Sequence, residues 1–249
     1  MLGRFILKNI YPIKTRVKIL NSMIEDNYIF KYYKKTLKIY DDPREIPLGK
    51  IYCVGKNYLD HIIEMNDSNH DEPPFYFTKL EQSITQEKTL EFPSGTNNLE
   101  YEVELVVYLK KKCRNIQIEN VDEYILGYSV GIDLTKRDLQ KIAKEKGQPW
   151  DLSKGFDNSG PVSKIKLSNK VIKDGKIQLK QNGEIKQSSD ISKMIWSIDK
   201  IISNLSFQVT LNAGDAIFTG TPSGVGKIKK NDTLEATIEN VGSLEVKFK

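Results

Sequence analysis

A Glu-Val-Glu triplet inside an otherwise apolar run constrains the fold of this chain more than any other feature. The run covers residues 101–109, and its β-branched and aromatic residues favour a β-strand. Alternate residues of a strand point to the same face, so Glu102 and Glu104 would present two carboxylates side by side. They either form the solvated face of an edge strand, or they lie at the edge of the core, where an unpaired carboxylate is costly.

A divalent cation would remove that cost if the pair is buried. Asp133 could add a third carboxylate, and Mg²⁺ and Mn²⁺ prefer oxygen ligands. The chain has only two histidines and two cysteines, which argues against a zinc site built from imidazoles or thiolates. The three acids therefore indicate a candidate magnesium or manganese site, while the edge-strand interpretation stays open.

Beyond Lys50 the sequence is typical of many short strands and few helices. Strands are predicted at residues 51–55, 75–79, 101–109, 125–132, 216–219, 233–238 and 244–248, with a hairpin over 177–187 that turns at Asn182-Gly183. Helical spacing is limited to residues 57–65, 135–146 and 192–205. No alternation of strand and helix supports a parallel doubly wound sheet. We therefore predict an α+β fold of mixed, largely antiparallel β-sheets with few helices.

The charge balance narrows the possible partners. The chain has 38 basic and 33 acidic residues, a nearly balanced surface that argues against a nucleic-acid partner and suits small anionic substrates. No apolar run is long enough to cross a bilayer, so no membrane partner is expected. Two cysteines provide no disulfide framework, which indicates a reducing compartment.

The N-terminal segment differs in character from the rest. We expect residues 46–249 to form one catalytic domain and residues 1–45 to be an extension. Residues 1–24 contain Lys and Arg but no Asp or Glu, a pattern typical of a mitochondrial targeting segment, although Pro12 interrupts any helix. The alternatives are a short element of the folded domain or an irregular extension, in a cytoplasmic protein.

Several separate segments resemble the fumarylacetoacetate hydrolase family, in the family's order, from about residue 50 to 248. They are IYCVGKNY at 51–58 with Asp60, His61 and Glu64, YEVEL at 101–105, Gly127-Tyr128, Asp133, Arg137-Asp138 with Gln140, Trp150 with Lys154 and Phe156, and TGTPSGVG at 219–226. GQPW at 147–150 and MIWSI at 194–198 are most similar to the short, single-domain branch of acylpyruvases and oxaloacetate decarboxylases. The resemblance implies the fold of the family's C-terminal domain and a homodimer.

The resemblance also implies a reaction. In the family, the positions of Glu102, Glu104 and Asp133 hold Mg²⁺ or Mn²⁺. The expected activity is hydrolysis of acylpyruvates to pyruvate and a carboxylate, or decarboxylation of oxaloacetate, both through a metal-bound enolate of pyruvate. An oxaloacetate keto-enol tautomerase would need the same ligands. A catalytically silent, metal-binding interaction protein is the alternative outside the enzymes.

Four further residues match family positions around the substrate. Lys154 would stabilise negative charge that grows in the transition state. Thr221, in a glycine-rich loop that allows close backbone approach, would hold the substrate carboxylate. Arg137 and Gln140 are three residues apart, so on a helix both can face one ligand, or they form a surface pair.

His61 and Glu64 would form a general-base dyad if the segment is helical. Their spacing places them on one face, where the glutamate can orient the imidazole while its other nitrogen takes a proton from water. A structural pair is the alternative, but the resemblance places them where acylpyruvases keep such a dyad. Three positions depart from the family: Lys56 replaces an arginine, Gly155 a serine, and Lys136 a small residue. Lysine loses the bidentate geometry of arginine, so substrate preference could differ.

Overall fold

The computed structural model describes residues 29, 33–65 and 73–249. The predicted targeting segment, residues 1–24, lies outside them. Residues 36–249 form one compact unit, which begins inside the predicted extension 1–45. Its first element is a hairpin of β1 (Thr36–Ile39) and β2 (Asp42–Pro47), and β1 buries Leu37 and Ile39 in the core.

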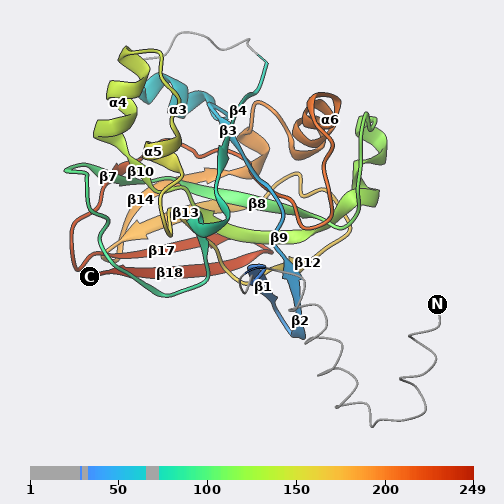
Figure 1. Cartoon of the computed structure of the whole chain (residues 1–249), viewed down its shortest axis with the longest axis horizontal. Helices are drawn as coiled ribbons and strands as arrows, with labels where there is room; N and C mark the ends of the chain where they lie inside the picture. The colour runs from blue at the N-terminus through green and yellow to red at the C-terminus, as the bar shows by residue number, and fades with distance from the viewer. Residues whose placement is uncertain (1–28, 30–32, 66–72) are drawn as a thin grey trace. The chain divides into compact units, whose positions relative to one another are not determined.

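Two β-sheets form the body of this unit (Figure 1). The larger has the order β12 (Lys166–Leu167), β9 (Ile125–Ile132), β8 (Val103–Leu109), β15 (Ala216–Phe218), β3 (Ile51–Gly55), β4 (Phe75–Lys79). The smaller has the order β14 (Glu184–Asp190), β13 (Lys176–Gln181), β17 (Thr233–Ile238), β18 (Gly242–Phe248), β6 (Thr89–Leu90). Only the β15–β3 and β18–β6 pairs of these two sheets are parallel. The predicted α+β fold of mixed, largely antiparallel sheets is confirmed.

Smaller sheets and a few helices complete the unit. The small sheets are β10 (Thr135–Lys136) with β7 (Leu99–Tyr101) and β16 (Gly226–Lys227), and β11 (Gly160–Pro161) with β5 (Ile84–Thr85). The α-helices are α3 (Leu59–Glu64), α4 (Arg137–Glu145), α5 (Asp151–Lys154) and α6 (Ile198–Gln208), and the 3₁₀ helices are η1 (Glu81–Ser83), η2 (Ile118–Tyr124) and η3 (Ile191–Lys193). Helices α3, α4 and α5 gather at one end of the sheets (Figure 1). Among the described residues, none of the helices has the length and apolar character needed to span a membrane.

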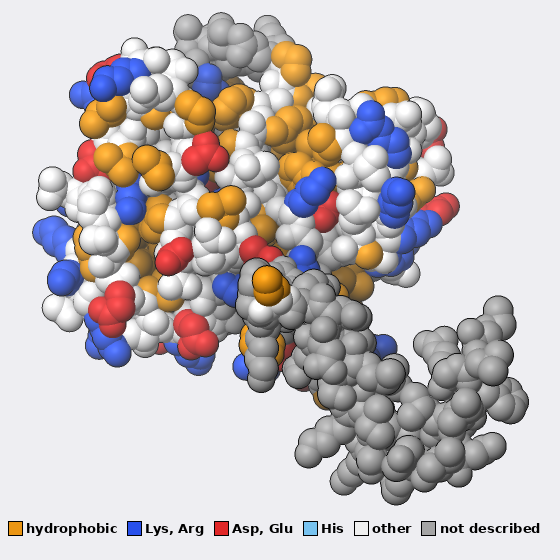
Figure 2. Space-filling view, viewed as in Figure 1, with side chains coloured by type: hydrophobic (Ala, Val, Ile, Leu, Met, Phe, Trp, Pro, Cys, Tyr) orange, Lys and Arg blue, Asp and Glu red, His pale blue; other side chains and the backbone are white. Residues whose placement is uncertain are grey.

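Strand β8 is covered on both faces. Leu105 and Val107 pack into the core between the two large sheets, and Val106 and Tyr108 pack into a second cluster that includes β1. All seven residues of β8 are buried, which explains its continuous apolar run. The exterior differs, because acidic and basic side chains are interspersed over the face shown in Figure 2.

The hairpin prediction is confirmed, and two other predictions need correction. Asn182 and Gly183 both have positive φ, as a two-residue hairpin turn requires. The strand predicted at 101–109 is interrupted at Glu102, where the chain passes from β7 to β8. The helix predicted at 192–205 starts only at Ile198, because the Asn57 side chain binds the backbone N–H and C=O of Trp196 and holds that residue in a non-helical bend.

Candidate active site

Three buried carboxylates lie together at the end of the large sheet. One carboxylate oxygen from each of Glu102, Glu104 and Asp133 lies within 4.8 Å of the others. Register explains this arrangement: β8 pairs with β9 so that Glu104 is opposite Gly131, and Asp133 N donates to Glu102 O at 2.8 Å just beyond the paired residues. The three residues are at most 5% exposed and β8 is an inner strand, so they are not the solvated face of an edge strand.

Two buried lysines neutralise part of this charge. Lys154, at the end of α5, donates from Nζ to Glu102 Oε2 at 2.8 Å and to Asp133 Oδ2 at 2.7 Å. Lys79, at the end of β4, brings its Nζ to 2.8 Å from Asp133 Oδ1 and donates to Ser159 Oγ at 3.0 Å. The sequence did not single out Lys79, because one lysine at a strand end among 38 basic residues gives no local signal.

Arg137 holds the other side of Glu102. Its Nη2 donates to Glu102 Oε1 at 2.6 Å, its Nε to Glu100 Oε2 at 2.7 Å, and its Nη1 to Gln140 Oε1 at 2.7 Å. Arg137 and Gln140 both line the pocket described below, so they are not a pair on the outer surface. The structure shows one role for Arg137 directly, which is to fix the Glu102 carboxylate.

The surroundings give the two glutamates opposite pKa shifts. Burial alone would raise the pKa of Glu102, but the charges of Lys154 and Arg137 outweigh it and leave that pKa well below its usual range. Burial raises the pKa of Glu104 well above its usual value, and the nearby carboxylates of Asp133 and Glu102 add to this rise. Burial opposes the charged form of Lys154, yet Asp133 and Glu102 raise the pKa of this lysine to about 12.

The donor set suits a hard divalent cation. Glu104 receives one backbone hydrogen bond, from Gly220 N to Oε2 at 2.7 Å. Asp133 Oδ1 accepts no hydrogen bond, although it is buried and the Lys79 ammonium is near. Three convergent carboxylates with unused oxygen lone pairs match the ligand preference of Mg²⁺ and Mn²⁺.

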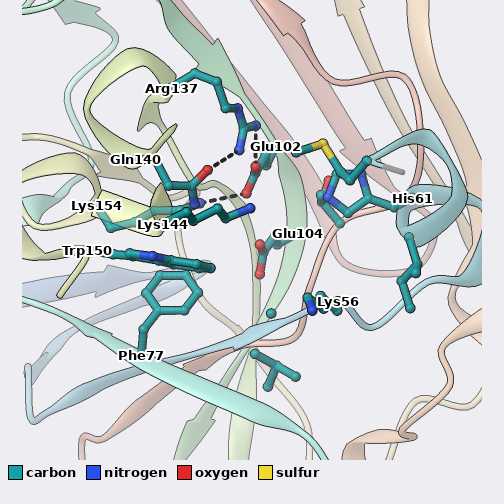
Figure 3. Close-up of a pocket in the computed structure, with 15 residues that line it drawn as sticks. Lys56, His61, Phe77, Glu102, Glu104, Arg137, Gln140, Lys144, Trp150 and Lys154 are labelled. Carbon is teal, nitrogen blue, oxygen red and sulfur yellow. Dashed lines mark hydrogen bonds and ion pairs between the residues drawn. The ribbon is translucent and has the colours of Figure 1, made fainter. Parts of the chain in front are cut away.

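A pocket opens directly onto Glu102 and Glu104. Its lining includes Lys56, His61, Phe77, Glu102, Glu104, Arg137, Gln140, Lys144, Trp150, Lys154 and Thr221. The two glutamates lie between His61 on one side and the rings of Trp150 and Phe77 on the other (Figure 3). A small molecule in this pocket would therefore touch the carboxylates, an imidazole and an aromatic wall together.

His61 and Glu64 contact each other as their spacing on α3 predicts. His61 Nδ1 lies 3.1 Å from Glu64 Oε2, and the Glu64 carboxylate also accepts hydrogen bonds from Gly224 N at 3.0 and 3.2 Å. The glycine-rich loop thus anchors the glutamate that orients the imidazole. Because Nδ1 is engaged, Nε2 is the ring nitrogen left for a water or a substrate.

Thr221 is tied to β8 by a residue that the sequence did not single out. Gln187 Nε2 donates to Thr221 Oγ1 and to Pro222 O, both at 2.8 Å, and Gln187 Oε1 accepts from Val103 N at 2.9 Å. Gln187 belongs to β14, far from both partners in sequence, and nothing distinguishes it from other polar strand residues. This buried amide fixes the position of the loop against the carboxylate strand.

Comparison with known proteins agrees with this geometry. The family described as "Fumarylacetoacetate (FAA) hydrolase C-terminal" matches residues 50–249. Among curated relatives, "Oxaloacetate tautomerase FAHD1, mitochondrial" of Homo sapiens is 40% identical over 199 residues, which is 79% of this chain and 90% of the relative. Fumarylpyruvate hydrolase of Ralstonia sp is 38% identical over 177 residues, or 70% of this chain and 92% of that protein.

Solved structures give the same result. The crystal structure of fumarylpyruvate hydrolase from Pseudomonas aeruginosa in complex with Mn²⁺ and pyruvate has a TM-score of 0.86 and 36% identity, over 89% of this chain and 99% of that one. This chain belongs to the fumarylacetoacetate hydrolase family, and the predicted resemblance is confirmed.

Proposed function

We propose that this member of the fumarylacetoacetate hydrolase family is a metal-dependent enzyme that hydrolyses acylpyruvates to pyruvate and a carboxylate, or processes oxaloacetate. The observation that carries the proposal is the buried group of Glu102, Glu104 and Asp133, which borders a pocket that also holds His61 and Lys154. The relatives support it, since one is a fumarylpyruvate hydrolase solved with Mn²⁺ and pyruvate and another is an oxaloacetate tautomerase.

Glu102, Glu104 and Asp133 would hold Mg²⁺ or Mn²⁺. Such an ion, when bound, acts as a Lewis acid for the keto oxygen of a 2-oxo acid. Arg137 and Lys79 keep the Glu102 and Asp133 carboxylates in place through contacts of 2.6 and 2.8 Å. The lysines and the arginine also reduce repulsion among the three anions.

Three of the chain's residues act on the substrate or on the attacking water, and Glu64 acts through His61. His61 Nε2 takes the proton from a water that attacks the distal carbonyl, and Glu64 stabilises the imidazolium that results. The Lys154 ammonium stabilises negative charge on the substrate oxygens. Thr221 and the loop around it bind the substrate carboxylate. The same His61 could transfer a proton at the carbon beside the keto group, which is the step that an oxaloacetate tautomerase needs.

A silent interaction protein is less consistent with the site. Buried charges contribute little net stability and are often less stable than an apolar packing of equal volume. If this protein had only a structural role, apolar residues in place of Lys79, Lys154 and the three acids would increase its stability. Their complete, mutually bonded arrangement beside an open pocket is the arrangement that catalysis requires.

The decisive experiment is an assay of the purified protein with Mg²⁺ on acetylpyruvate, fumarylpyruvate and oxaloacetate. Pyruvate formation and keto-enol exchange are followed separately. Chelation should abolish turnover, and Glu102→Gln and Asp133→Asn should weaken metal binding. Glu100→Gln is the matched control, because Glu100 contacts Arg137 but lies outside the carboxylate group, so its effect should be smaller. Full activity in excess chelator, or equal losses in all three variants, would contradict the proposed metal site.

Two further features are proposed, a homodimer from the family resemblance and mitochondrial targeting from the basic, acid-free composition of residues 1–24. A homodimer would be tested by analytical ultracentrifugation. Mitochondrial targeting by residues 1–24 would be tested by fusing them to a fluorescent reporter, and a diffuse cytosolic signal would favour the cytoplasmic alternative. Because the matched segments begin at residue 50, removal of residues 1–24 should leave turnover unchanged.

A further inference from the structure

An aromatic wall leads outward from the carboxylate group. The ring centroids of Phe77 and Trp150 are 5.8 Å apart, and those of Trp150 and Phe75 are 5.0 Å apart with an angle of 61°. Phe77 and Trp150 line the pocket, and both also line a neighbouring open groove. The wall therefore continues beyond the space that a small 2-oxo acid group would fill.

A lysine lies against each of the two rings that line the pocket. Lys154 Nζ lies 5.1 Å from the Phe77 centroid. Lys144 Nζ lies 5.1 Å from the Trp150 centroid, and Figure 3 shows its side chain extending over Trp150 into the pocket. The two lysines differ in their partners, because Lys154 binds two carboxylates while Lys144 makes no ion pair with any described residue.

The charges around Lys144 are mostly positive. Partial burial of its ammonium lowers the pKa of Lys144, and repulsion from Arg137 and Lys56 lowers this pKa further. Glu102 is the nearby anion, but it is already bound to Arg137 and Lys154. An incoming anion would therefore be attracted to Lys144 rather than compete with an existing partner.

Lys144 is not needed to balance the metal site. The three carboxylates of that site are matched by Lys79, Lys154 and Arg137, all within hydrogen-bond or ion-pair distance. Lys144 lies at the solvent-exposed rim, on the last turn of α4. Its contact with the Trp150 ring holds the ammonium at the wall, and among the described residues none accepts a hydrogen bond from its Nζ.

We propose that Lys144 binds the second carboxylate of a dicarboxylic 2-oxo acid, whose carbon chain lies along Trp150 and Phe77. The inference rests on the proposed function and defines its substrate class. The enzyme would favour dianionic substrates such as fumarylpyruvate and oxaloacetate over monoanionic acylpyruvates such as acetylpyruvate. Lys144 is thus a specificity-determining residue at a subsite that is separate from the metal ligands.

A binding measurement tests the subsite without turnover. 2-Oxoglutarate and 2-oxopentanoate have the same carbon chain and differ in a terminal carboxylate against a methyl group. Calorimetric titration of the Mg²⁺-loaded protein should show tighter binding of 2-oxoglutarate by about tenfold, the scale of one charge-assisted hydrogen bond at an exposed site. Lys144→Gln should remove this difference and Lys144→Arg should restore most of it.

Lys141→Gln is the matched control, because Lys141 lies on the same helix but is 78% exposed and outside the pocket lining. It should keep the wild-type preference. Steady-state kinetics should agree, with Lys144→Gln raising KM for fumarylpyruvate about tenfold and changing KM for acetylpyruvate less than twofold. If wild type binds both oxo acids equally, or Lys144→Gln weakens both equally, the subsite is refuted. A wild-type protein that shows the binding preference but turns over no substrate would refute the proposed function alone.

Discussion

Replacement of His61 by alanine should separate the reactions that this site can support. The His61 imidazole is 11% exposed, lines the pocket and lies 3.1 Å from the Glu64 carboxylate. Its loss therefore removes the proposed general base. Loss of a positioned general base costs about 10² to 10⁴ in rate. Acylpyruvate hydrolysis needs an activated water and should fall by that factor. Decarboxylation of oxaloacetate needs no attacking water and should fall less.

The companion variant Glu64→Gln should have a smaller effect. Glutamine keeps an oxygen that can accept from Gly224 N and from the imidazole, and it loses only the negative charge. A charge-assisted hydrogen bond is roughly twice as strong as a neutral one, so we expect about a tenfold loss of hydrolysis. Asp60→Asn, an exposed change on the same helix, is the control and should be neutral.

The assay pairs pyruvate formation from acetylpyruvate with pyruvate formation and keto-enol exchange for oxaloacetate. Metal affinity is measured by titration for each variant, and should not change in His61→Ala. Unchanged hydrolysis in both His61→Ala and Glu64→Gln would remove the dyad from the mechanism. Equal losses in hydrolysis and decarboxylation would show that α3 acts by closing the pocket rather than by moving a proton.

Three further predictions follow from the buried groups. Lys79→Met removes one of the two lysine ammonium groups beside the Asp133 carboxylate and should lower the free energy of unfolding, measured in urea, by about 3 to 5 kcal/mol. The control Lys166→Met changes an exposed lysine and should be neutral. A decrease below about 1 kcal/mol for Lys79→Met would contradict the prediction. Burial and the nearby carboxylates of Asp133 and Glu102 raise the pKa of Glu104, so the metal-free folded protein binds this proton more tightly than the unfolded chain does. Mg²⁺ binding should therefore displace the proton from Glu104 and tighten as pH rises. Because the folded pKa of Glu104 is raised, the stability of the protein in chelator should fall as pH rises above about 4.5, the pKa of this glutamate in the unfolded chain. A binding enthalpy that does not depend on the buffer, with an affinity that does not depend on pH, would refute both statements. Gln187→Ala leaves the Val103 N–H without its acceptor, so the free energy of unfolding should fall by about 1 to 3 kcal/mol and KM should rise. Denaturation and steady-state kinetics measure these two effects, and no change in either would contradict the prediction.

Local patterns predicted most of the strands and the pair of alternating glutamates, Glu102 and Glu104. The apolar run of β8, the Asn182-Gly183 turn and the Glu-x-Glu spacing each depend on neighbours in sequence, so they can be read from the chain alone. The family resemblance supplied Asp133, Lys154 and His61 as one set. Their roles in turnover stay predictions until the assays above are done.

The missed features all depend on partners distant in sequence. The helix does not begin at residue 192 as predicted, because the Asn57 side chain forms hydrogen bonds with the backbone of Trp196, 139 residues away in sequence. Lys79 contributes through its ion pair with Asp133. Gln187 contributes through its hydrogen bond from Val103 N, 84 residues away in sequence. No periodicity within a short window carries such information, because each side chain would be unremarkable on a solvated strand.

The hydrogen bond from Gly220 to Glu104 has a consequence for biosynthesis. It joins residues 116 positions apart, and β16, which pairs with the strand before Glu102, starts only at Gly226. Strands β8 and β9 leave the ribosome long before these partners, so a nascent chain carries its acidic cluster in an incomplete form. We therefore expect ligand-binding competence only after the segment around residue 226 has been translated, and magnesium should not promote the earlier stages of folding. Hydrogen exchange on ribosome-stalled chains should show the ion protecting β8 only after the segment around residue 226 has emerged.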